Sequence, residues 1–577
     1  MNEPTQSIWK RPWQSPRALL IWLGLLAAAT FIIIVSFGLL AGTGKNEGLA
    51  PFALVASVVV SIVVTVGVLF IRWLCCWRNL RRLAFVLVCL ATLIALVIAE
   101  ENWRGKSNWE KAREQYEANG EKFTIAALLP PQVPDDKNLA LTPLLKPLLD
   151  YTQAPGGGAV VWADTNGQAR LRNLSAYLAP HRDTNDQVIL GNLEKGTFAD
   201  LLACAAFYRG NTNYPQAPAT ATPAETILVA LGKFRPELDQ LREAAAARPY
   251  CRFPVHYETE PPWVILLPHL ASVKALVQLL HVHALAELEA GHPAEAFEDL
   301  QLGQRFSQSL REEPLLIDHL VRIAALAIDL QTVREGLVRH AWNDVQLTSI
   351  ETNLAPINLL AEHKVAMRGE QACEIEGLNY LRRQGWRSNP FDYVDSAGNS
   401  GPSFFLFPSG WYYQNMLTIC RLMHEFSFPA VDETARRVFP DITARGAQTF
   451  TNMPTRPYNI FAKMVLPAFS RAAERSARSQ TYVDAAHMAC ALERYRLANG
   501  NLPDSLETLV PKFLERIPND VIDGKPLRYR KSPDGGYLLY SIGWNQTDDG
   551  GKLWWVKDKK ESRVDSTKGD WVWIMPK

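Results

Sequence analysis

Residues 18–42 read ALLIWLGLLAAATFIIIVSFGLLAG and contain no charged side chain. Two more uncharged runs follow, at residues 49–71 and 83–99. About 20 apolar residues span the roughly 30 Å hydrocarbon core of a bilayer, so the first two runs are long enough and the third is at the lower limit. A cleaved signal peptide is the alternative for the first run, but that run is longer than a usual signal-peptide core and two more follow. The sequence therefore predicts three transmembrane helices.

Basic residues are unevenly divided between the ends of these helices. They lie before the first run and between the second and third runs: Lys10, Arg11, Arg17, Arg72, Arg78, Arg81 and Arg82. The link between the first and second runs holds only Lys45 and Glu47 as charged residues. Cytoplasmic loops carry an excess of Lys and Arg, so we expect the N-terminus to lie in the cytoplasm and the chain after about residue 100 to lie outside it.

Charge and cysteine content argue against some classes of function for the whole chain. Of its 577 residues, 60 are Lys or Arg and 59 are Asp or Glu, which gives a net charge of +1 and argues against a nucleic-acid-binding protein. The cysteines that follow the membrane runs are Cys204, Cys251, Cys373, Cys420 and Cys490. Their number is odd, so at least one is unpaired within the chain, and no spacing typical of zinc ligands occurs. We interpret them mainly as buried thiols.

The residue pattern divides the chain into four regions: an anchor at 1–99, a juxtamembrane helix and connector at 100–158, a mainly helical body at 159–475 and a small domain at 476–577. The charged stretch Trp103–Leu129 predicts a helix that leaves the membrane. Six prolines between Pro130 and Pro155 predict an extended connector after it. Apolar residues at helical spacing between Pro223 and Gln346 predict antiparallel helical hairpins.

Two short stretches of the helical body have patterns of their own. AGHPAEAFEDL, at residues 290–300, resembles the turn and second helix of a tetratricopeptide repeat, although a repeat fold normally needs about three units at a fixed period. The aromatic stretch GPSFFLFPSGWYYQN, at residues 401–415, would be costly to expose. It predicts a buried loop or plug, and the alternative is an element that touches the membrane or a partner protein.

Residues 476–577 contain sequence patterns of both helices and strands. QTYVDAAHMACALERYRLA, at residues 480–498, predicts a helix that stops at Asn499 and Gly500, where glycine allows a left-handed conformation. Strands are predicted at 527–531 and 537–542, joined by a turn. A helix, a loop, a short helix and antiparallel strands make an α+β domain.

The segments ALERYRLANGNLPDSLETLVP, DGKPLRY and YLLYSIGWNQTDDGG, followed by DWVW, resemble the C-terminal domain of the major pseudopilin of type II secretion systems, the protein G family. The resemblance covers under a fifth of the chain and implies the fold of that domain. A pseudopilin begins with a short leader, a processing site and a helix with an early Glu, whereas residues 18–42 contain no Glu and two more apolar runs follow. What carries over is the domain fold rather than polymerisation into a pilus.

The resemblance also implies a calcium site, because the pseudopilin family binds calcium in the loop after its last long strand. The matching loop is 543–551, with Asn545, Asp548 and Asp549 as oxygen donors and Asp570 closing the site from the distal arm. Calcium takes about six to eight oxygen ligands, so Asp and Asn in a glycine-rich loop are chemically suitable. The alternative is an ordinary solvated turn, because Asn545 stands where the family prefers Asp and the loop is a residue longer.

No motif of a known catalytic class occurs, whether a GxSxG elbow, an HExxH helix or a Rossmann glycine pattern. One predicted helix holds Glu362, His363, Glu370 and Glu374, and positions 363, 370 and 374 lie near one face of it and could ligate a metal. Arginines lie equally near at helical spacing, at Arg368, Arg382 and Arg383, so ion pairing is the preferred interpretation.

The functional expectation depends on location and architecture. We expect a bacterial inner-membrane protein with three N-terminal transmembrane helices, a mainly α-helical soluble body and a small pseudopilin-like α+β domain. Its outer part is expected to be a scaffold or to bind proteins, with a link to secretion or envelope assembly. Its expected partners are the lipid bilayer and envelope or secretion proteins, and no nucleic acid. The alternative is a membrane-tethered enzyme with an unrecognised outer active site.

Overall fold

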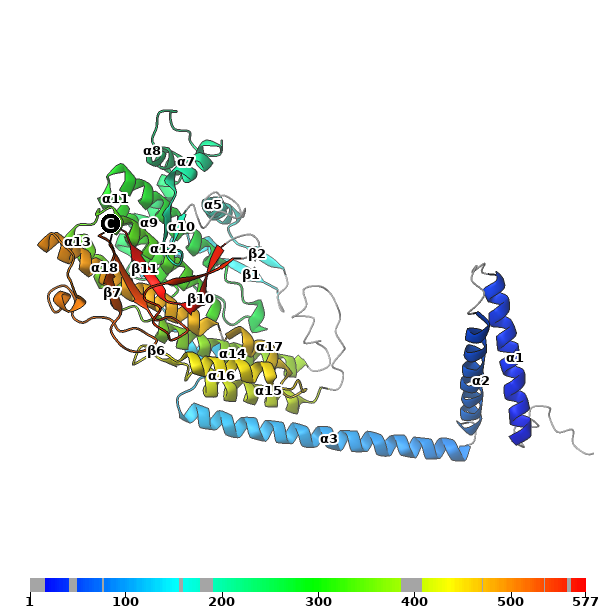
Figure 1. The fold of residues 1–577 in the computed structure, drawn as a ribbon. Helices are drawn as coiled ribbons and strands as arrows, with labels where there is room; N and C mark the ends of the chain where they lie inside the picture. The colour runs from blue at the N-terminus through cyan, green and yellow to red at the C-terminus, as the bar shows by residue number, and fades with distance from the viewer. Residues whose placement is uncertain are drawn as a thin grey trace, which may run out of the picture. The chain divides into compact units, whose positions relative to one another are not determined.

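A computed structural model divides the chain into two compact units, Met1–Glu100 and Glu101–Lys577 (Figure 1). The residues that it describes are 16–40, 49–74, 77–154, 159–176, 190–384, 407–469, 471–533, 535–557 and 562–576. Several residues used in the sequence analysis lie outside this description: Lys10, Arg11, Lys45, Glu47 and residues 401–406 of the aromatic stretch.

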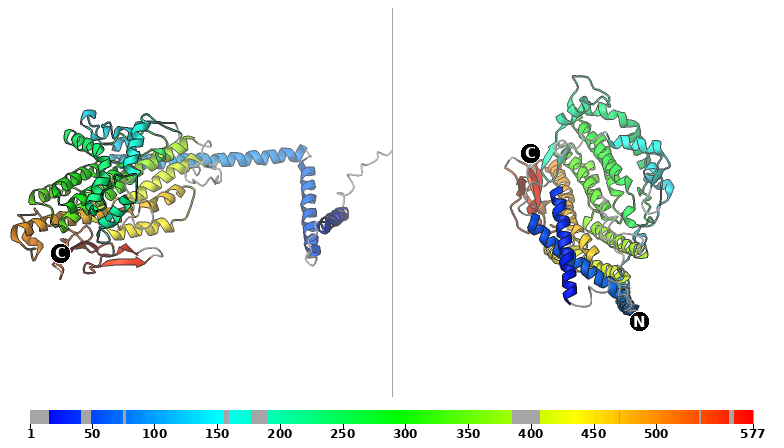
Figure 2. Two further views of the ribbon diagram at one scale, coloured as in Figure 1. Left: turned by 90° about the horizontal axis from the view of Figure 1, so that it is seen from above. Right: turned by 90° about the vertical axis from the view of Figure 1, so that its right-hand side faces the viewer.

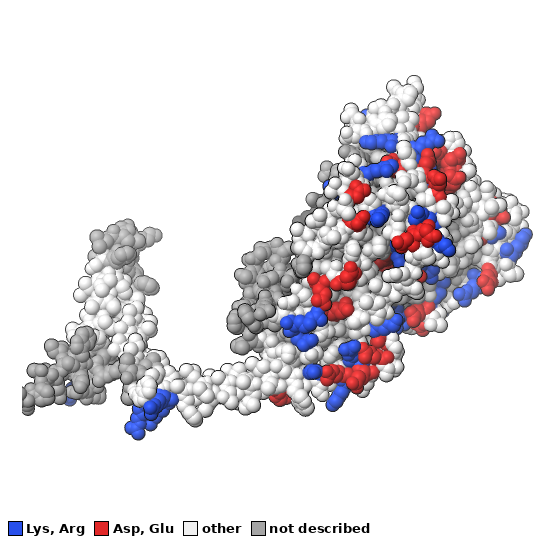
Figure 3. Space-filling view, turned by 180° about the vertical axis from the view of Figure 1, so that it is seen from behind, with Lys and Arg blue, Asp and Glu red and all other residues white. Residues whose placement is uncertain are grey.

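The first unit is built from apolar helices. α1 (Pro16–Leu40), α2 (Leu49–Leu74) and α3 (Trp77–Ala118) each contain a stretch that is long and apolar enough to cross a membrane. In Figure 3 most of the described part of this unit is white, with a group of basic side chains in blue at one end. The prediction of three N-terminal helices of membrane-spanning length is therefore confirmed.

Helix α2 packs against α1 through small side chains. Ala53, Ser57, Ser61 and Thr65 recur at every fourth position of α2 and are buried. The Ser61 hydroxyl donates to the backbone oxygen of Ser57 at 2.6 Å, and Thr30 of α1 donates to the same oxygen at 3.5 Å. Small residues at this spacing allow two helix backbones to approach closely in a membrane.

The bounds of helix α3 differ from those predicted from the sequence at both its start and its end. The sequence predicted separate segments at 83–99 and Trp103–Leu129, whereas a single helix of 42 residues runs from Trp77 to Ala118. No proline interrupts this helix. It ends before Gly120, whose φ of 87° is left-handed, so the second predicted segment stops well before Leu129.

The second unit is mainly helical, as the sequence predicted. Its longer helices are α5 (Thr165–Ala176), α7 (Leu201–Arg209), α8 (Pro223–Leu231), α9 (Arg235–Ala247), α10 (Pro268–Ala290), α11 (Pro293–Gln308), α12 (Leu316–Val338), α13 (Asp344–Leu354), α14 (Leu359–Gln384), α15 (Ser409–Leu422), α16 (Pro440–Asn452), α17 (Ile460–Phe469) and α18 (Ala472–Asn499). Its short helices are α4 (Ile125–Leu128), η3 (Asp135–Lys137), η4 (Leu139–Leu141), η5 (Lys146–Leu148), η6 (Gly232–Phe234), η7 (Pro262–Val264), the π-helix η10 (Met423–Ser427) and η11 (Leu506–Leu509). Proline begins α8, α10, α11 and α16, where its missing N–H costs no helical hydrogen bond.

Small antiparallel sheets accompany these helices. Strands β7 (Arg528–Lys531), β8 (Tyr537–Ser541) and β11 (Trp571–Met575) form one sheet in the order β11-β8-β7, in which Trp571 lies opposite Ser541. The two-stranded pairs are β1 (Tyr151–Gln153) with β2 (Val160–Trp162), β3 (Leu190–Asn192) with β4 (Thr197–Ala199), β5 (Val431–Asp432) with β6 (Arg437–Val438), and β9 (Leu553–Lys557) with β10 (Ser562–Gly569). Strands β7 and β8 agree with the strands predicted at 527–531 and 537–542.

Helix α18 runs through the core of the second unit. Its side chains Val483, Ala486 and Leu492 belong to one hydrophobic cluster with Trp342, which follows α12, and Trp573 of β11. The expected boundary between residues 475 and 476 falls inside this helix. Figure 2 shows the C-terminal strands lying against the helices. Residues 476–577 therefore share their core with the helices that precede them.

Residues 135–149, which the prolines predicted to be extended, are folded into η3, η4 and η5. Leu139, Leu144 and Leu148 are buried in a hydrophobic cluster of the second unit. The Asn138 side chain donates from Nδ2 to the backbone oxygen of Arg252 at 2.8 Å. Pro147 lies in the first turn of η5, where a proline costs no hydrogen bond, so a proline-rich stretch is compatible with short helices.

The second half of the aromatic stretch begins α15 instead of forming a loop. Tyr412 is 4% exposed and belongs to a hydrophobic cluster that includes Trp109 of α3. Gly410 lies against the backbone of Glu101, and its N–H donates to Asn102 Oδ1 at 2.8 Å. The described aromatic residues are therefore packed within the second unit, together with the last turns of α3.

Candidate functional site

Three of the four residues predicted to bind calcium are joined by hydrogen bonds. Asn545 donates from Nδ2 to Asp549 Oδ2 at 2.9 Å. The Asp570 carboxylate accepts from the backbone N–H of Asp549 at 3.2 Å and from that of Gly551 at 2.6 Å. Burial raises the pKa of Asp570, and these two hydrogen bonds oppose the rise. The structure thus brings Asn545, Asp549 and Asp570 together, with Asp548 beside them in the chain.

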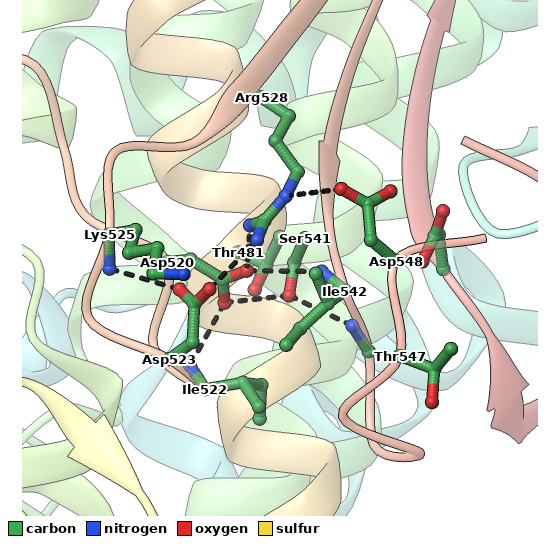
Figure 4. A network of polar contacts seen from close by, with 12 residues as sticks. Thr481, Asp520, Ile522, Asp523, Lys525, Arg528, Ser541, Ile542, Thr547 and Asp548 are labelled. Atoms are coloured by element: carbon green, nitrogen blue, oxygen red, sulfur yellow. Dashed lines mark hydrogen bonds and ion pairs between the residues drawn. The ribbon is translucent and has the colours of Figure 1, made fainter. Parts of the chain in front are cut away.

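Asp548 faces a second network, centred on Arg528 of β7 (Figure 4). The Arg528 guanidinium donates from Nη1 to Asp520 Oδ2 at 2.9 Å, from Nη2 to Asp523 Oδ2 at 2.8 Å and from Nε to Asp548 Oδ2 at 3.0 Å. Asp520 is 1% exposed, and the Ser541 hydroxyl donates to its Oδ1 at 2.7 Å. Bonds between ionised partners are stronger than neutral ones, so Arg528 links three acidic residues firmly. The sequence analysis identified only one of these residues.

The residues present fit this arginine-centred network better than a calcium site. Calcium needs about six to eight oxygen ligands, whereas the carboxylates of Asp548 and Asp570 already accept hydrogen bonds within the protein. Among the residues that the structure describes, no group of three or more His, Cys, Asp or Glu is arranged as a metal site. Calcium binding by Asn545, Asp548, Asp549 and Asp570 therefore stays a prediction.

Calcium is expected to stabilise an Arg528→Ala variant more than the unaltered protein. The substitution leaves the carboxylates of Asp520, Asp523 and Asp548 without their cation, and a ligand at 100 times its Kd stabilises a fold by about 2.7 kcal/mol. The measurement is the Tm of each full chain in detergent, with millimolar calcium or with chelator. An equal rise in both proteins, abolished by replacing Asp548 and Asp549 with Ala, would instead support the loop site predicted from the sequence.

The acidic residues of α14 that could ligate a metal by their spacing contact other groups of the protein instead. Glu362 pairs with the buried Arg322 at 3.3 Å, and Glu370 accepts from the backbone N–H of Leu316 at 2.8 Å. Burial raises the pKa of Glu374 to about 8, so this side chain is largely protonated at neutral pH. Ion pairing is the role of Glu362, although its partner is not one of the arginines considered from sequence spacing.

Ser476 of α18 lies between two histidines, an arrangement that can activate a hydroxyl for nucleophilic catalysis. Its Oγ is 2.9 Å from His319 Nε2 and 3.3 Å from His363 Nδ1. All three residues are buried, and Ser476 is 0% exposed. A substrate cannot reach this hydroxyl, so the trio serves the packing of α12, α14 and α18.

A cavity of about 750 Å³ opens beside α9 and α11 in the second unit. The charged residues that line it are Arg242, Arg252, Glu298, Arg305, Arg311 and Glu312. Arg242 of α9 pairs with Asp299 of α11, which ties the two helices together. We name it the four-arginine cavity; three of these arginines pair with carboxylates, so the charge that remains to attract an anion comes mainly from Arg305.

Arg305 is the arginine of the cavity with most capacity for a ligand. Arg252 pairs with Glu312 and Arg311 pairs with Glu362, whereas no carboxylate among the described residues forms an ion pair with Arg305. One Arg305 nitrogen, Nη2, donates to the backbone oxygen of Arg248, and its Nε is buried without a hydrogen-bond partner. A guanidinium in this state can take a carboxylate or phosphate through two parallel hydrogen bonds.

Gln304 adds an unpartnered amide to the same cavity. It is 4% exposed, its Oε1 accepts from Asn353 Nδ2 at 2.9 Å, and its Nε2 has no hydrogen-bond partner. An unsatisfied buried donor costs about 1–3 kcal/mol, and a ligand oxygen would remove that cost. Burial raises the pKa of Cys251, which also lines the cavity, to about 12, so its thiol is neutral and a poor nucleophile. The cavity has the chemistry of anion binding.

Sequence reasoning missed the four-arginine cavity because its arginines are scattered along the chain. Arg242 and Arg305 come from different helices and meet only through helix packing. The contact that assembles the cavity, between Arg242 and Asp299, joins positions 57 residues apart.

Comparison of the chain with models of protein families, with curated proteins and with solved structures found no match. The function therefore has to follow from the residues of this chain and their geometry.

Proposed function

We propose that this protein is a membrane-anchored protein-interaction protein whose second unit binds an acidic segment of a partner protein. The observation that carries the proposal is the four-arginine cavity, in which Arg305 has no described carboxylate partner and Gln304 Nε2 has no hydrogen-bond partner. Its volume of about 750 Å³ is within the range of roughly 300–1,000 Å³ typical of ligand sites. An Asp or Glu side chain would pair with Arg305 and accept a hydrogen bond from Gln304.

The compartment is part of the same proposal. The basic residues at the start of α1, at the end of α2 and in the first turns of α3 support an N-terminus in the cytoplasm and a second unit outside it, for which we propose a bacterial inner membrane. The pseudopilin resemblance of residues 476–577 supports a link to secretion or envelope assembly. A reporter that works only outside the cytoplasm should be active after Lys577 and inactive at Asn79, and the opposite pattern would overturn this orientation.

Arg305→Glu is expected to weaken the binding of a fluorescein-labelled hexaglutamate peptide at least about tenfold, because it replaces the cation of the cavity with a carboxylate. The measurement is fluorescence polarisation with the full chain in lipid nanodiscs at low salt. A hexalysine peptide should not bind, and added salt should weaken the glutamate peptide.

Arg235→Glu is the matched control, because Arg235 lies on α9, is 81% exposed and does not line the cavity. It changes the net charge by the same amount and should leave the affinity nearly unchanged. Failure of the hexaglutamate peptide to bind, or an equal loss in both variants, would contradict the proposed function.

A further inference from the structure

A second cavity adjoins the four-arginine cavity. Its volume is about 400 Å³, and it lies among the segments around residues 129–141, 252–257 and 309–314. The residues that line both cavities are Val133, Arg252, Ser309 and Glu312. The two cavities are therefore neighbouring compartments of one groove, with the Arg252–Glu312 ion pair at their common wall.

The second cavity differs from the first in character. Its apolar lining consists of Leu129, Pro130, Val133, Leu141, Phe253, Pro254, Val255 and Pro314. The carboxyl of Glu313 is 8% exposed and accepts a hydrogen bond from the Tyr257 hydroxyl. Burial raises the pKa of Glu313, which favours its uncharged form. The compartment therefore suits an apolar group.

The wall between the compartments is held in place by several contacts. Arg252 donates to Glu312 and to the backbone oxygen of Pro131, and its own backbone N–H donates to Asn138 Oδ1 at 2.9 Å. Arg252 is 24% exposed and Glu312 is 61% exposed at the side chain, so the pair faces the groove. A ligand that extends through both compartments contacts arginines in the first, and mainly apolar surface together with Asp135 in the second.

Resting on the proposed function, we propose that the bound partner segment carries acidic residues followed or preceded directly by large aliphatic side chains. The acidic residues occupy the four-arginine cavity, and an aliphatic side chain occupies the second cavity. Either cavity alone would suit a compact ligand of the usual size, but together they exceed the roughly 1,000 Å³ upper range for such ligands, which favours an extended peptide segment.

The test compares three labelled peptides, EEELL, EEESS and KKKLL, on the full chain in nanodiscs, with empty nanodiscs subtracted. EEELL is expected to bind about tenfold or more tightly than EEESS, because burial of one aliphatic side chain contributes at least that factor. KKKLL is expected not to bind. If neither acidic peptide binds, the proposed function fails. If EEELL and EEESS bind equally well, the function stands and this inference is overturned.

Leu129→Asp supplies the matched variant, because Leu129 is 37% exposed at the second cavity and its replacement leaves the buried core intact. We expect it to reduce the preference for EEELL over EEESS to less than about threefold while the affinity for EEESS stays within about threefold. Leu202→Asp, at a position 71% exposed and away from both cavities, should keep the full preference. If Leu129→Asp left the preference for EEELL over EEESS unchanged, the leucines of the peptide would bind outside the second cavity, and the inference would be contradicted.

Discussion

Replacement of Arg334 by Met is expected to lower the free energy of unfolding of the second unit by about 3 kcal/mol, because it leaves buried backbone oxygens without a donor. Arg334 of α12 is 1% exposed. It donates to the backbone oxygens of Gly196 at 2.8 Å, Thr197 at 3.3 Å and Ile574 at 3.1 Å. One side chain thus holds the β3–β4 turn and the last strand, β11, on α12.

Urea denaturation of the full chain in detergent measures this loss, and hydrogen exchange locates it. Backbone amides of β8 and β11 should exchange faster in Arg334→Met than in the unaltered protein. Arg170→Met is the control, since Arg170 is 48% exposed and its ion pair with Glu237 is expected to contribute only about 0–1 kcal/mol. Equal denaturation midpoints for the two variants would show that β11 does not depend on Arg334.

Gly410→Ala is expected to destabilise the packing of α3 on α15 by about 3 kcal/mol, because an added Cβ has no room. That Cβ would lie 2.0 Å from the backbone oxygen of Glu101, and a Cβ on Gly105 would lie 2.3 Å from the backbone oxygen of Gly410. Backbone atoms cannot move aside as a flexible side chain can. Release of this contact would also expose Trp109, which is 3% exposed.

Limited proteolysis with trypsin checks this expectation, because the released segment contains cleavable residues: Arg104, Lys106, Lys111 and Arg113. Cleavage there should be at least about tenfold faster in Gly410→Ala, since opening a local segment becomes easier as its packing weakens. Gly232→Ala is the matched control, as no atom lies within 4 Å of its added Cβ. Cleavage at the control rate would contradict the close contact between α3 and α15.

Elements with a local signal could be predicted from the sequence. Uncharged runs identified the N-terminal helices. Gly500, whose φ is 79°, marks the predicted end of α18, and the short run rich in aromatic and aliphatic residues at 537–542, next to a turn, identified β8. Each of these features depends on neighbours in the chain, and the physical rules for them need no knowledge of the rest of the fold.

Features that depend on distant partners were missed. A buried arginine such as Arg334 has the same sequence appearance as an exposed one, because its partners Gly196 and Ile574 are 138 and 240 positions away. The same reason hides the scattered arginines of the four-arginine cavity and the role of Arg528 between its acidic partners. The prediction of an extended connector from the prolines of residues 130–158 was wrong for a different reason. Proline is also compatible with the first turn of a short helix.

The central position of α18 has a consequence for folding during translation. A ribosome completes α12 long before it begins α18 and β11, so Trp342 and Leu347 lack the partners that cover them in the finished fold. At about 5–20 residues per second, translation of the last hundred residues takes roughly 5–20 s, during which this apolar surface is open to chaperones. A chain terminated early keeps that surface exposed. Chains that contain α18 and β11 bury this surface, so a protease that acts on exposed apolar segments would distinguish them from shorter chains.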